Sequence, residues 1–310
     1  MNKMRVALIA GGKSAEREVS LKSGDQVFKA LNKDKYEIRR YDPLNDLERL
    51  VREAAAIDVA LIIMHGRGGE DGTVQGLLDL LEIPYQGSGV LGSALGMNKE
   101  LSKILYQEAG LKVARTLFFD RASAPTPAAI EAQLGLPAVI KPVNEGSSIG
   151  VTIARTQEEL KTGLEAAFQY DYRVLVEEFI QGTEVTGGVL GNHKLTALPL
   201  VEIIPSESYA FFSYDAKYLP GASTEICQAR LDPETTKKAQ QCALTAHRAL
   251  HCRGYSRTDM IVRDGQIYVL ETNTIPGMTA TSLFPQAAQA LGLEFPQLLD
   301  TLIELALEKS

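Results

Sequence analysis

The sequence is short of cysteine and of positive charge, and each shortage excludes a class of protein. The three cysteines, Cys227, Cys242 and Cys252, are odd in number and show no paired metal-binding spacing. Neither a disulfide framework nor a zinc site is therefore expected, and a reducing cytoplasm is the expected location. The net charge of -7 argues against a nucleic-acid partner, because phosphate backbones require a basic surface. A small anionic ligand in a local basic pocket stays compatible with this balance.

The chain also lacks internal repeats and low-complexity tracts, and its start lacks a membrane-spanning length. The first apolar run, Met4 to Ala10, predicts a buried strand instead. No membrane partner is expected. With 45% apolar and 23% charged residues over 310 positions, the composition predicts a soluble globular protein of two or three domains.

The first ninety residues alternate between short apolar runs and stretches of helical spacing. This order predicts an N-terminal α/β domain, residues 1–92, whose parallel strands present ligand-binding loops at their ends. Two of those loops carry Glu16 and His65. The predicted elements are a strand at Met4 to Ala10, a helix capped by Ser14, and strands at Tyr36 to Tyr41 and Val59 to Met64.

Two features of this domain leave alternatives. The turn Gly11-Gly12 lacks the third glycine of the dinucleotide fingerprint, so a nicotinamide cofactor is not expected. A lone histidine is usually structural. The position of His65 at a strand end between glycines makes a functional role about as well supported as a structural one.

A second region, residues 93–182, predicts a smaller α+β domain. Its first helix carries Lys99 and Lys103. A loop rich in glycine and serine, residues 142–148, can surround phosphates with backbone N–H groups and hydroxyls. It is not a P-loop, because no helix follows and the Gly-Lys-Ser/Thr sequence is absent. The predicted strands are Pro137 to Lys141, Gly150 to Ala154 and Val174 to Glu178.

The third region, residues 183–310, is rich in predicted strands. Its segment 206–223 is long, aromatic and without regular periodicity, which is typical of a functional lid. His247 and His251 lie one turn apart on a predicted helix. Because the glutamate of the metalloprotease pattern and a third ligand are missing, no metal site is expected there.

The stretch Asp259 to Thr279 predicts a β-hairpin that ends in Glu-x-Asn and Pro-Gly. Glu271 and Asn273 lie two residues apart and therefore share one face of a strand. Together with Asp259 they form a set of oxygen ligands suited to Mg²⁺ held with substrate phosphates. The alternative is an ordinary solvent-facing hairpin with acidic ends.

The register of this hairpin decides whether the two carboxylates can meet. A two-residue turn at Asp264-Gly265 followed by a regular ladder would put Asp259 and Glu271 on opposite faces. A three-residue loop, Arg263-Asp264-Gly265, with Gly265 in the left-handed conformation, shifts the ladder by one residue. We predict this three-residue loop, because it returns both carboxylates to one face.

Six segments occur in an order that resembles the D-alanine–D-alanine ligase family over nearly the whole chain. That family has the ATP-grasp fold, in which an N-terminal α/β domain precedes central and C-terminal domains that clamp ATP. The resemblance implies ATP-dependent joining of two D-alanine molecules through an acyl phosphate, for peptidoglycan precursors. The segments are AGGKSAEREVSL, HGRGGEDGTVQG, IKPVNEGSSIGV, YDAKYLPG, RTDM and ETNTIPGMTATSL.

The resemblance assigns a nucleotide site. It implies ATP with two Mg²⁺ ions, Mn²⁺ as a substitute and an optional K⁺, the metal ligands being Asp259, Glu271 and Asn273. Glu178 departs from the lysine of many relatives, but its expected contact is through the backbone. The implied nucleotide-binding residues are the phosphate-binding Lys99, Lys141 and Lys217, the loop residues Ser147 and Ser148, the adenine-binding Glu177, Glu178 and Ile180, and Glu184 at the ribose.

The resemblance also assigns an amino-acid site. Glu16 corresponds to the carboxylate that holds the ammonium of the first D-alanine, with Ser147 and Tyr218 as its hydrogen-bonded partners across a closed lid. Arg257 and the backbone N–H of Gly277 correspond to the pair that stabilises the oxyanion. The second carboxylate is assigned to Ser282 and Lys217, with His65 nearby.

The resemblance also bears on the lid segment 206–223, called the flap from here on, and on the oligomeric state. The Lys217-Tyr218 pair resembles that of ligases that join D-alanine to D-alanine, while Phe212 replaces the tyrosine of some relatives. A homodimer through the N-terminal domain is implied. Two alternatives stay open at this point: an ATP-grasp ligase for another acceptor, such as D-lactate or D-serine, and a non-catalytic nucleotide-binding relative.

Overall fold

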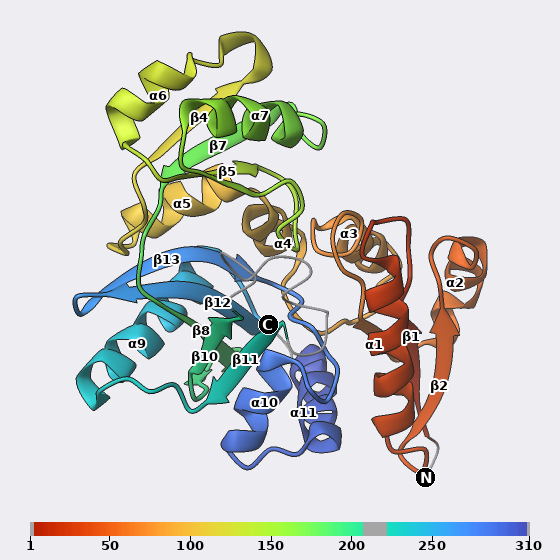
Figure 1. The fold of residues 1–310 in the computed structure, drawn as a ribbon. Helices are drawn as coiled ribbons and strands as arrows, with labels where there is room; N and C mark the ends of the chain where they lie inside the picture. The colour runs from red at the N-terminus through yellow and green to blue at the C-terminus, as the bar shows by residue number, and fades with distance from the viewer. Residues whose placement is uncertain (1–2, 207–221, 309–310) are drawn as a thin grey trace.

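The structure is a computed structural model that describes residues 3–206 and 222–308, and three β-sheets organise it (Figure 1). One sheet is parallel and two are antiparallel, so the mixed α/β class predicted from the sequence is confirmed. No helix in the described ranges is long and apolar enough to cross a membrane.

The N-terminal sheet has the order β2-β1-β3, with all three strands parallel as predicted. The predicted helix cap is wrong: α1 begins at Arg17 with Glu16 at its N-cap position. The Ser14 hydroxyl donates instead to the His65 carbonyl at 2.7 Å, which joins the two loops. The elements are β1 (Met4–Ile9), α1 (Arg17–Ala30), β2 (Tyr36–Tyr41), α2 (Leu47–Glu53), η1 (Ala54–Ala56), β3 (Val59–Ile62) and α3 (Thr73–Leu80).

The central sheet has the order β4-β7-β5-β6 and forms the upper lobe of Figure 1. Asn98 caps α5 by accepting a hydrogen bond from the backbone of Leu101, which separates α4 from α5. The elements are α4 (Val90–Met97), α5 (Lys99–Glu108), β4 (Thr116–Asp120), η2 (Arg121–Ser123), α6 (Pro127–Leu134), β5 (Ala138–Pro142), β6 (Thr152–Ala154), α7 (Gln157–Ala167) and β7 (Arg173–Glu178).

The C-terminal sheet runs β11-β10-β8-β12-β13, with β9 beside β8. Helix α9 covers one face of this sheet through its buried alanines. The elements are β8 (Thr183–Gly191), β9 (Thr196–Ala197), β10 (Val201–Pro205), β11 (Ser223–Cys227), α9 (Pro233–Ala249), β12 (Gly254–Arg263), β13 (Gln266–Asn273), α10 (Leu283–Ala290) and α11 (Phe295–Leu307).

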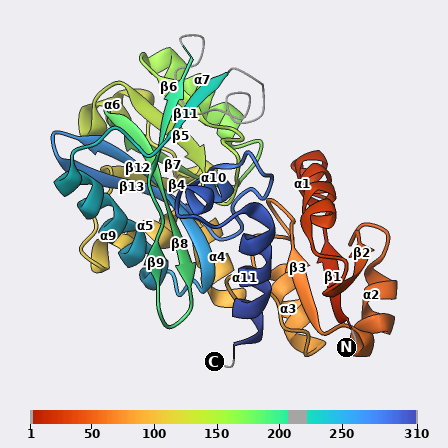
Figure 2. The same ribbon diagram turned by 90° about the horizontal axis from the view of Figure 1, so that it is seen from below.

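Helix α11 joins the first and last regions of the chain. Its buried side chains Leu298, Leu299 and Leu302 pack in one cluster with Val6 and Leu8 of β1. Seen from below, α11 lies between the N-terminal sheet and the C-terminal sheet (Figure 2). The N-terminal and C-terminal regions therefore share a hydrophobic core, which fixes their loops relative to each other.

In the hairpin of β12 and β13 the predicted loop length is wrong, but the two carboxylates lie on one face as predicted. The three-residue loop is wrong: Arg263 pairs with Gln266, and Asp264 and Gly265 have φ of 50° and 70°, as a two-residue type I′ turn requires. The ladder shifts further down, at a bulge that leaves Leu270 as an extra residue. Asp259 therefore pairs with Glu271 on the same face.

Candidate active site

A cavity of about 880 Å³ opens between the central sheet and the hairpin of the C-terminal sheet. Its walls come from β5 and β7 on one side and from β12 and β13 on the other. At one end the lining is aliphatic and aromatic, as a flat heterocyclic ring requires. The apolar residues at that end include Val139, Ile153, Phe179, Ile180 and Leu270.

The other end of this cavity is charged. Lys99 lies at the start of α5, and its ammonium is 3.4 Å from Glu271 Oε2 and also donates to the Glu145 carbonyl. Lys141 at the end of β5 lines the same end, as do Ser148 and Glu184. A cavity with an apolar slot and two lysine ammonium groups can hold a nucleotide, the base in the slot and the phosphates beside the lysines.

Glu177 is the most buried carboxylate of this cavity, with 2% of the residue exposed. Its two oxygens contact two lysines: Oε2 lies 2.7 Å from Lys103 Nζ, and Oε1 lies 2.5 Å from Lys141 Nζ. Burial alone would raise the pKa of Glu177, but the two ammonium charges outweigh it and lower the pKa to about 2. The carboxylate is therefore ionised at neutral pH.

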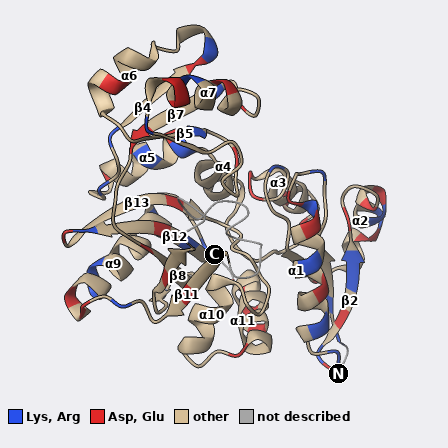
Figure 3. Ribbon diagram, in the orientation of Figure 1, with Lys and Arg blue, Asp and Glu red and all other residues tan. Residues whose placement is uncertain are grey.

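Lys103 had no assigned role in the sequence-based site. Its i, i+4 spacing from Lys99 puts both lysines on one face of α5, and this is the signal that could have found it. Figure 3 shows the acidic end of β7 (red) beside basic residues of α5 (blue). Burial lowers the pKa of Lys103, which Glu177 partly restores.

The three residues predicted to bind adenine, Glu177, Glu178 and Ile180, all line the cavity. The Glu178 carboxylate accepts hydrogen bonds from the backbone and the guanidinium of Arg115, each at 2.9 Å. Its side chain is therefore used within the protein. The backbone contact expected for Glu178 stays a prediction, as do the ligand contacts of Ile180 and Glu184.

The candidate metal ligands meet at the junction of the hairpin strands. The Asp259 carboxylate accepts two hydrogen bonds from Arg257, at 3.0 and 2.9 Å, and one each from Thr186 and Asn273. Within residues 3–206 and 222–308, no cluster of three or more His, Cys, Asp or Glu side chains forms a metal site. The set therefore has two carboxylates, with the Asn273 amide as its third oxygen.

This donor set fits Mg²⁺ in its chemistry. All three side chains offer oxygen, the two carboxylates are direct cross-strand partners, and Asp259 is buried. The negative charge is balanced in this structure by Arg257 and Lys99. A divalent ion would compete for the same carboxylate oxygens, with substrate phosphates supplying further oxygen ligands.

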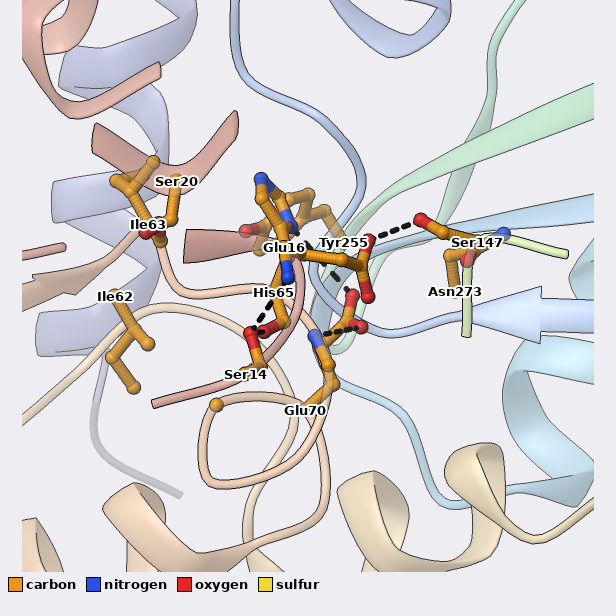
Figure 4. Close-up of polar contacts among 12 residues, drawn as sticks. Ser14, Glu16, Ser20, Ile62, Ile63, His65, Glu70, Ser147, Tyr255 and Asn273 are labelled. Carbon is orange, nitrogen blue, oxygen red and sulfur yellow. Dashed lines mark hydrogen bonds and ion pairs between the residues drawn. The ribbon is translucent and has the colours of Figure 1, made fainter. Parts of the chain in front are cut away.

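A second cavity, of about 1150 Å³, has Asn273 in its lining. Glu16 reaches it from the start of α1 and accepts a hydrogen bond from the Ser147 hydroxyl of the central region (Figure 4). Ser147 and Ser148 hold φ of 48° and 58°, a left-handed conformation that L residues rarely adopt. A Cβ on Gly146 would lie 3.1 Å from Glu16 Oε2, so the loop approaches the carboxylate closely.

His65 is buried in the wall of this cavity and faces Glu70, with Nδ1 3.9 Å from Glu70 Oε1 (Figure 4). Burial alone would lower the pKa of His65, whereas the carboxylates of Glu70 and Glu16 raise it above its ordinary value. The functional role of His65 stays a prediction.

The opposite wall of the second cavity is formed by Arg257, Gly277 and Ser282. A Cβ on Gly277 would lie 3.1 Å from Ser282 Oγ, so these two residues are direct neighbours. Thr279 donates its backbone N–H to Ser282 Oγ at 3.1 Å and fixes that hydroxyl. Lys217, Tyr218 and Phe212, which the sequence places in the flap, lie outside the described residues.

The two cavities meet at a smaller one of about 330 Å³. Its lining includes Lys99 and Glu271 from the first cavity, and Glu70 and Asn273 from the second. A nucleotide phosphate and an amino-acid carboxylate bound in the two large cavities would therefore come together beside the hairpin ligands. Most sequence-predicted site residues are brought into one continuous site.

Comparison with known proteins places this chain among proteins of one description. A family model described as "D-ala D-ala ligase N-terminus" matches residues 5–48 and 40–88, and "D-ala D-ala ligase C-terminus" matches residues 105–304. The D-alanine–D-alanine ligase of Syntrophobacter fumaroxidans is 63% identical over 99% of this chain and 98% of its own length. That of Desulfotalea psychrophila is 54% identical over 99% and 96%.

Solved structures give the same result for the fold. The D-alanine–D-alanine ligase of Bacillus anthracis complexed with ATP superimposes with a TM-score of 0.86 at 36% identity, covering 98% of this chain and 97% of that one. The VanG D-Ala:D-Ser ligase of Enterococcus faecalis reaches 0.83 at 34% identity, covering 99% and 100%. The ATP-grasp fold expected from the sequence is thereby confirmed, and the chain belongs to the D-alanine–D-alanine ligase family.

Proposed function

We propose that this chain uses ATP to join two D-alanine molecules into D-alanyl-D-alanine, a peptidoglycan precursor, by way of an acyl phosphate. The observation that carries this proposal is the meeting of two cavities at one hairpin, with Glu271 lining the first and Asn273 the second. Phosphoryl transfer to a carboxylate requires both substrates to meet at one charged point. The family membership supports the same chemistry.

In the nucleotide cavity, the apolar slot holds the adenine ring, and Lys99 and Lys141 bind the phosphates. Asp259, Glu271 and Asn273 would hold Mg²⁺, which when bound would supply neutralisation of the charge that develops on the phosphate oxygens. A requirement for two Mg²⁺ ions, and an effect of K⁺, belong to this proposal and rest on the family resemblance. The arrangement of Lys99 beside Glu271 at 3.4 Å supports a shared phosphate and metal position.

In the second cavity, Glu16 holds the ammonium of the first D-alanine, and Ser147 supports that carboxylate by its hydrogen bond. An oxygen of the D-alanine carboxylate attacks the terminal phosphorus of ATP, and ADP leaves. The product is an acyl phosphate that stays between Arg257 and the loop of Ser147.

The second D-alanine then supplies the attacking amine. After its ammonium releases a proton to the solvent, the nitrogen attacks the acyl carbon and the C–N bond forms; the C–O bond to phosphate then breaks, and the leaving phosphate takes up the second proton of the nitrogen. Arg257 and the backbone N–H of Gly277 stabilise the tetrahedral oxyanion. Ser282 binds the second carboxylate near His65, and Lys217 and Tyr218, outside the described residues, complete the closed site.

A homodimer in the cytoplasm is part of the proposal. Helix α2 and the turn before it expose Leu44, Leu47 and Val51, and α3 exposes Leu80 with 86% of its surface open to solvent. Such apolar side chains on the N-terminal domain support an interface between two copies. Sedimentation measurements on the purified protein would distinguish a dimer from a monomer.

The test of the acceptor is a competition assay. The enzyme is given ATP, Mg²⁺ and D-alanine, alone or with equal D-serine or D-lactate, and the products are separated by mass spectrometry across pH. The proposal predicts D-alanyl-D-alanine as the main product in every mixture. A main product ending in D-serine or D-lactate would reassign the acceptor while keeping the family.

A further inference from the structure

Lys103 is a buried lysine that lines none of the cavities of the site. Only 3% of its side chain is exposed, and its ammonium lies behind Glu177, 2.7 Å from Oε2. Among the described residues the ammonium makes no hydrogen bond, so the ion pair with Glu177 is the contact that compensates its charge. A buried lysine is costly unless a counter-ion stabilises it, so Lys103 and Glu177 depend on each other.

Glu177 carries one negative charge but contacts two ammonium groups, one more than is required to neutralise it. Its single negative charge lies between Lys103 on Oε2 and Lys141 on Oε1. The two lysines differ in access, because Lys141 lines the nucleotide cavity and Lys103 does not. Lys141 is also in the field of Glu271 and Glu184, toward the charged end of that cavity.

We propose that Lys103 is a positioning residue, a fixed counter-ion of Glu177 that frees Lys141 to bind the ATP phosphates. This inference rests on the proposed function, in which Lys141 contacts phosphate. When the phosphates draw Lys141 away from Glu177, Lys103 stays and keeps the buried carboxylate compensated. Without Lys103, the same movement would leave a buried charge alone, so Glu177 would retain Lys141.

We expect loss of the Lys103 charge to weaken binding of the ATP phosphates and to leave binding of the adenine ring unchanged. Lys103→Met keeps the length of the side chain and removes its charge, while Glu177 and Lys141 remain as a neutral pair. The expected result is ATP binding weakened about tenfold or more, with adenosine binding changed less than about twofold. Fluorescence or calorimetric titration of the purified full-length enzyme with both ligands measures this split.

A second variant tests whether the retained charge of Glu177 causes the loss of ATP affinity. It also distinguishes this cause from misfolding of the single variant. In the double variant Lys103→Met/Glu177→Gln both buried charges are gone, so nothing retains Lys141, and the ratio of ATP to adenosine affinity should return toward the wild-type ratio. Lys103→Arg keeps the charge and should bind both ligands nearly as the wild type does. Lys161→Met, an exposed lysine of α7, is the matched control.

Three results would overturn the proposal. Equal loss of ATP and adenosine affinity in Lys103→Met would mean that Lys103 only shapes the adenine end. Unchanged ATP affinity would mean that Lys141 needs no help to leave Glu177. A double variant with the same reduced ratio as Lys103→Met would remove Glu177 from the explanation. The proposed function fails separately, if the wild-type enzyme makes no dipeptide.

Discussion

Arg67 and Glu145 form an ion pair across the site, and breaking it is expected to weaken D-alanine binding. Arg67 lies in the loop after β3, and Glu145 lies in the loop that carries Ser147. Arg67 Nε is 2.8 Å from Glu145 Oε1, and the guanidinium also donates to the Tyr170 carbonyl at 3.4 Å. The pair therefore holds the central region against the N-terminal domain at the point where Ser147 meets Glu16.

The expected change in KM depends on how far the two side chains are exposed to solvent. The Glu145 side chain is 17% exposed, but that of Arg67 is 53% exposed, so solvent screens much of the attraction. A pair of this kind contributes about 0.5 to 1 kcal/mol, which corresponds to about a two- to fivefold rise in the KM for D-alanine. Reversing the charge with Arg67→Glu adds repulsion, so it is expected to raise KM further.

A double-mutant cycle measures this contribution. Steady-state KM values for D-alanine and ATP are determined for Arg67→Ala, Glu145→Gln and the combination, with the exposed Arg155→Ala as control. We expect the double variant to lose no more than either single variant does. Independent, multiplying losses in KM would show that the two side chains do not act as a pair, and the reasoning would be wrong.

Three further outcomes are expected. Glu16→Gln removes the charge that holds the first ammonium, so KM for D-alanine should rise about tenfold or more in initial-rate assays while KM for ATP stays constant. Gly182→Ala would put a Cβ 2.3 Å from the Val262 carbonyl oxygen, so the free energy of unfolding should fall by about 1 to 3 kcal/mol in urea titrations. The folded pKa of Glu177 is lowered to about 2, so its ionised carboxylate stabilises the protein above pH 4.5, and this stabilisation is lost as pH falls toward 2. The urea midpoint of Glu177→Gln should therefore change less with pH across this window than that of the wild type. Unchanged kinetics for Glu16→Gln, unchanged stability for Gly182→Ala, or an identical pH slope for Glu177→Gln would each contradict its prediction.

Local patterns in the sequence were enough to predict the parallel strands and the ligand loops. An apolar run followed by glycine and a helix describes β1 and α1, since each signal lies within a few residues. The ordered motifs likewise brought Glu16, Lys141 and Glu271 into one site. These residue types carry the chemistry wherever the fold places them together.

The errors concern features that depend on distant contacts. The three-residue loop put the register shift in the wrong place: Asp264-Gly265 forms the two-residue turn that its sequence favours, and the shift lies at the bulge of Leu270, which no local signal marks. Lys103 of helix α5 could not be assigned because its carboxylate partner, Glu177 of strand β7, lies 74 residues away in the chain. Register and burial are set by tertiary packing, which no short segment contains.

The central claim is that the paired carboxylates of the hairpin support phosphoryl transfer at the junction of the two cavities. The direct test is the rate of D-alanine-dependent ADP formation by Glu271→Gln, compared with Asp264→Asn at the exposed tip of the same hairpin. We predict that Glu271→Gln folds normally by circular dichroism and forms almost no ADP, while Asp264→Asn retains wild-type activity. Near wild-type ADP formation by Glu271→Gln would contradict the assignment.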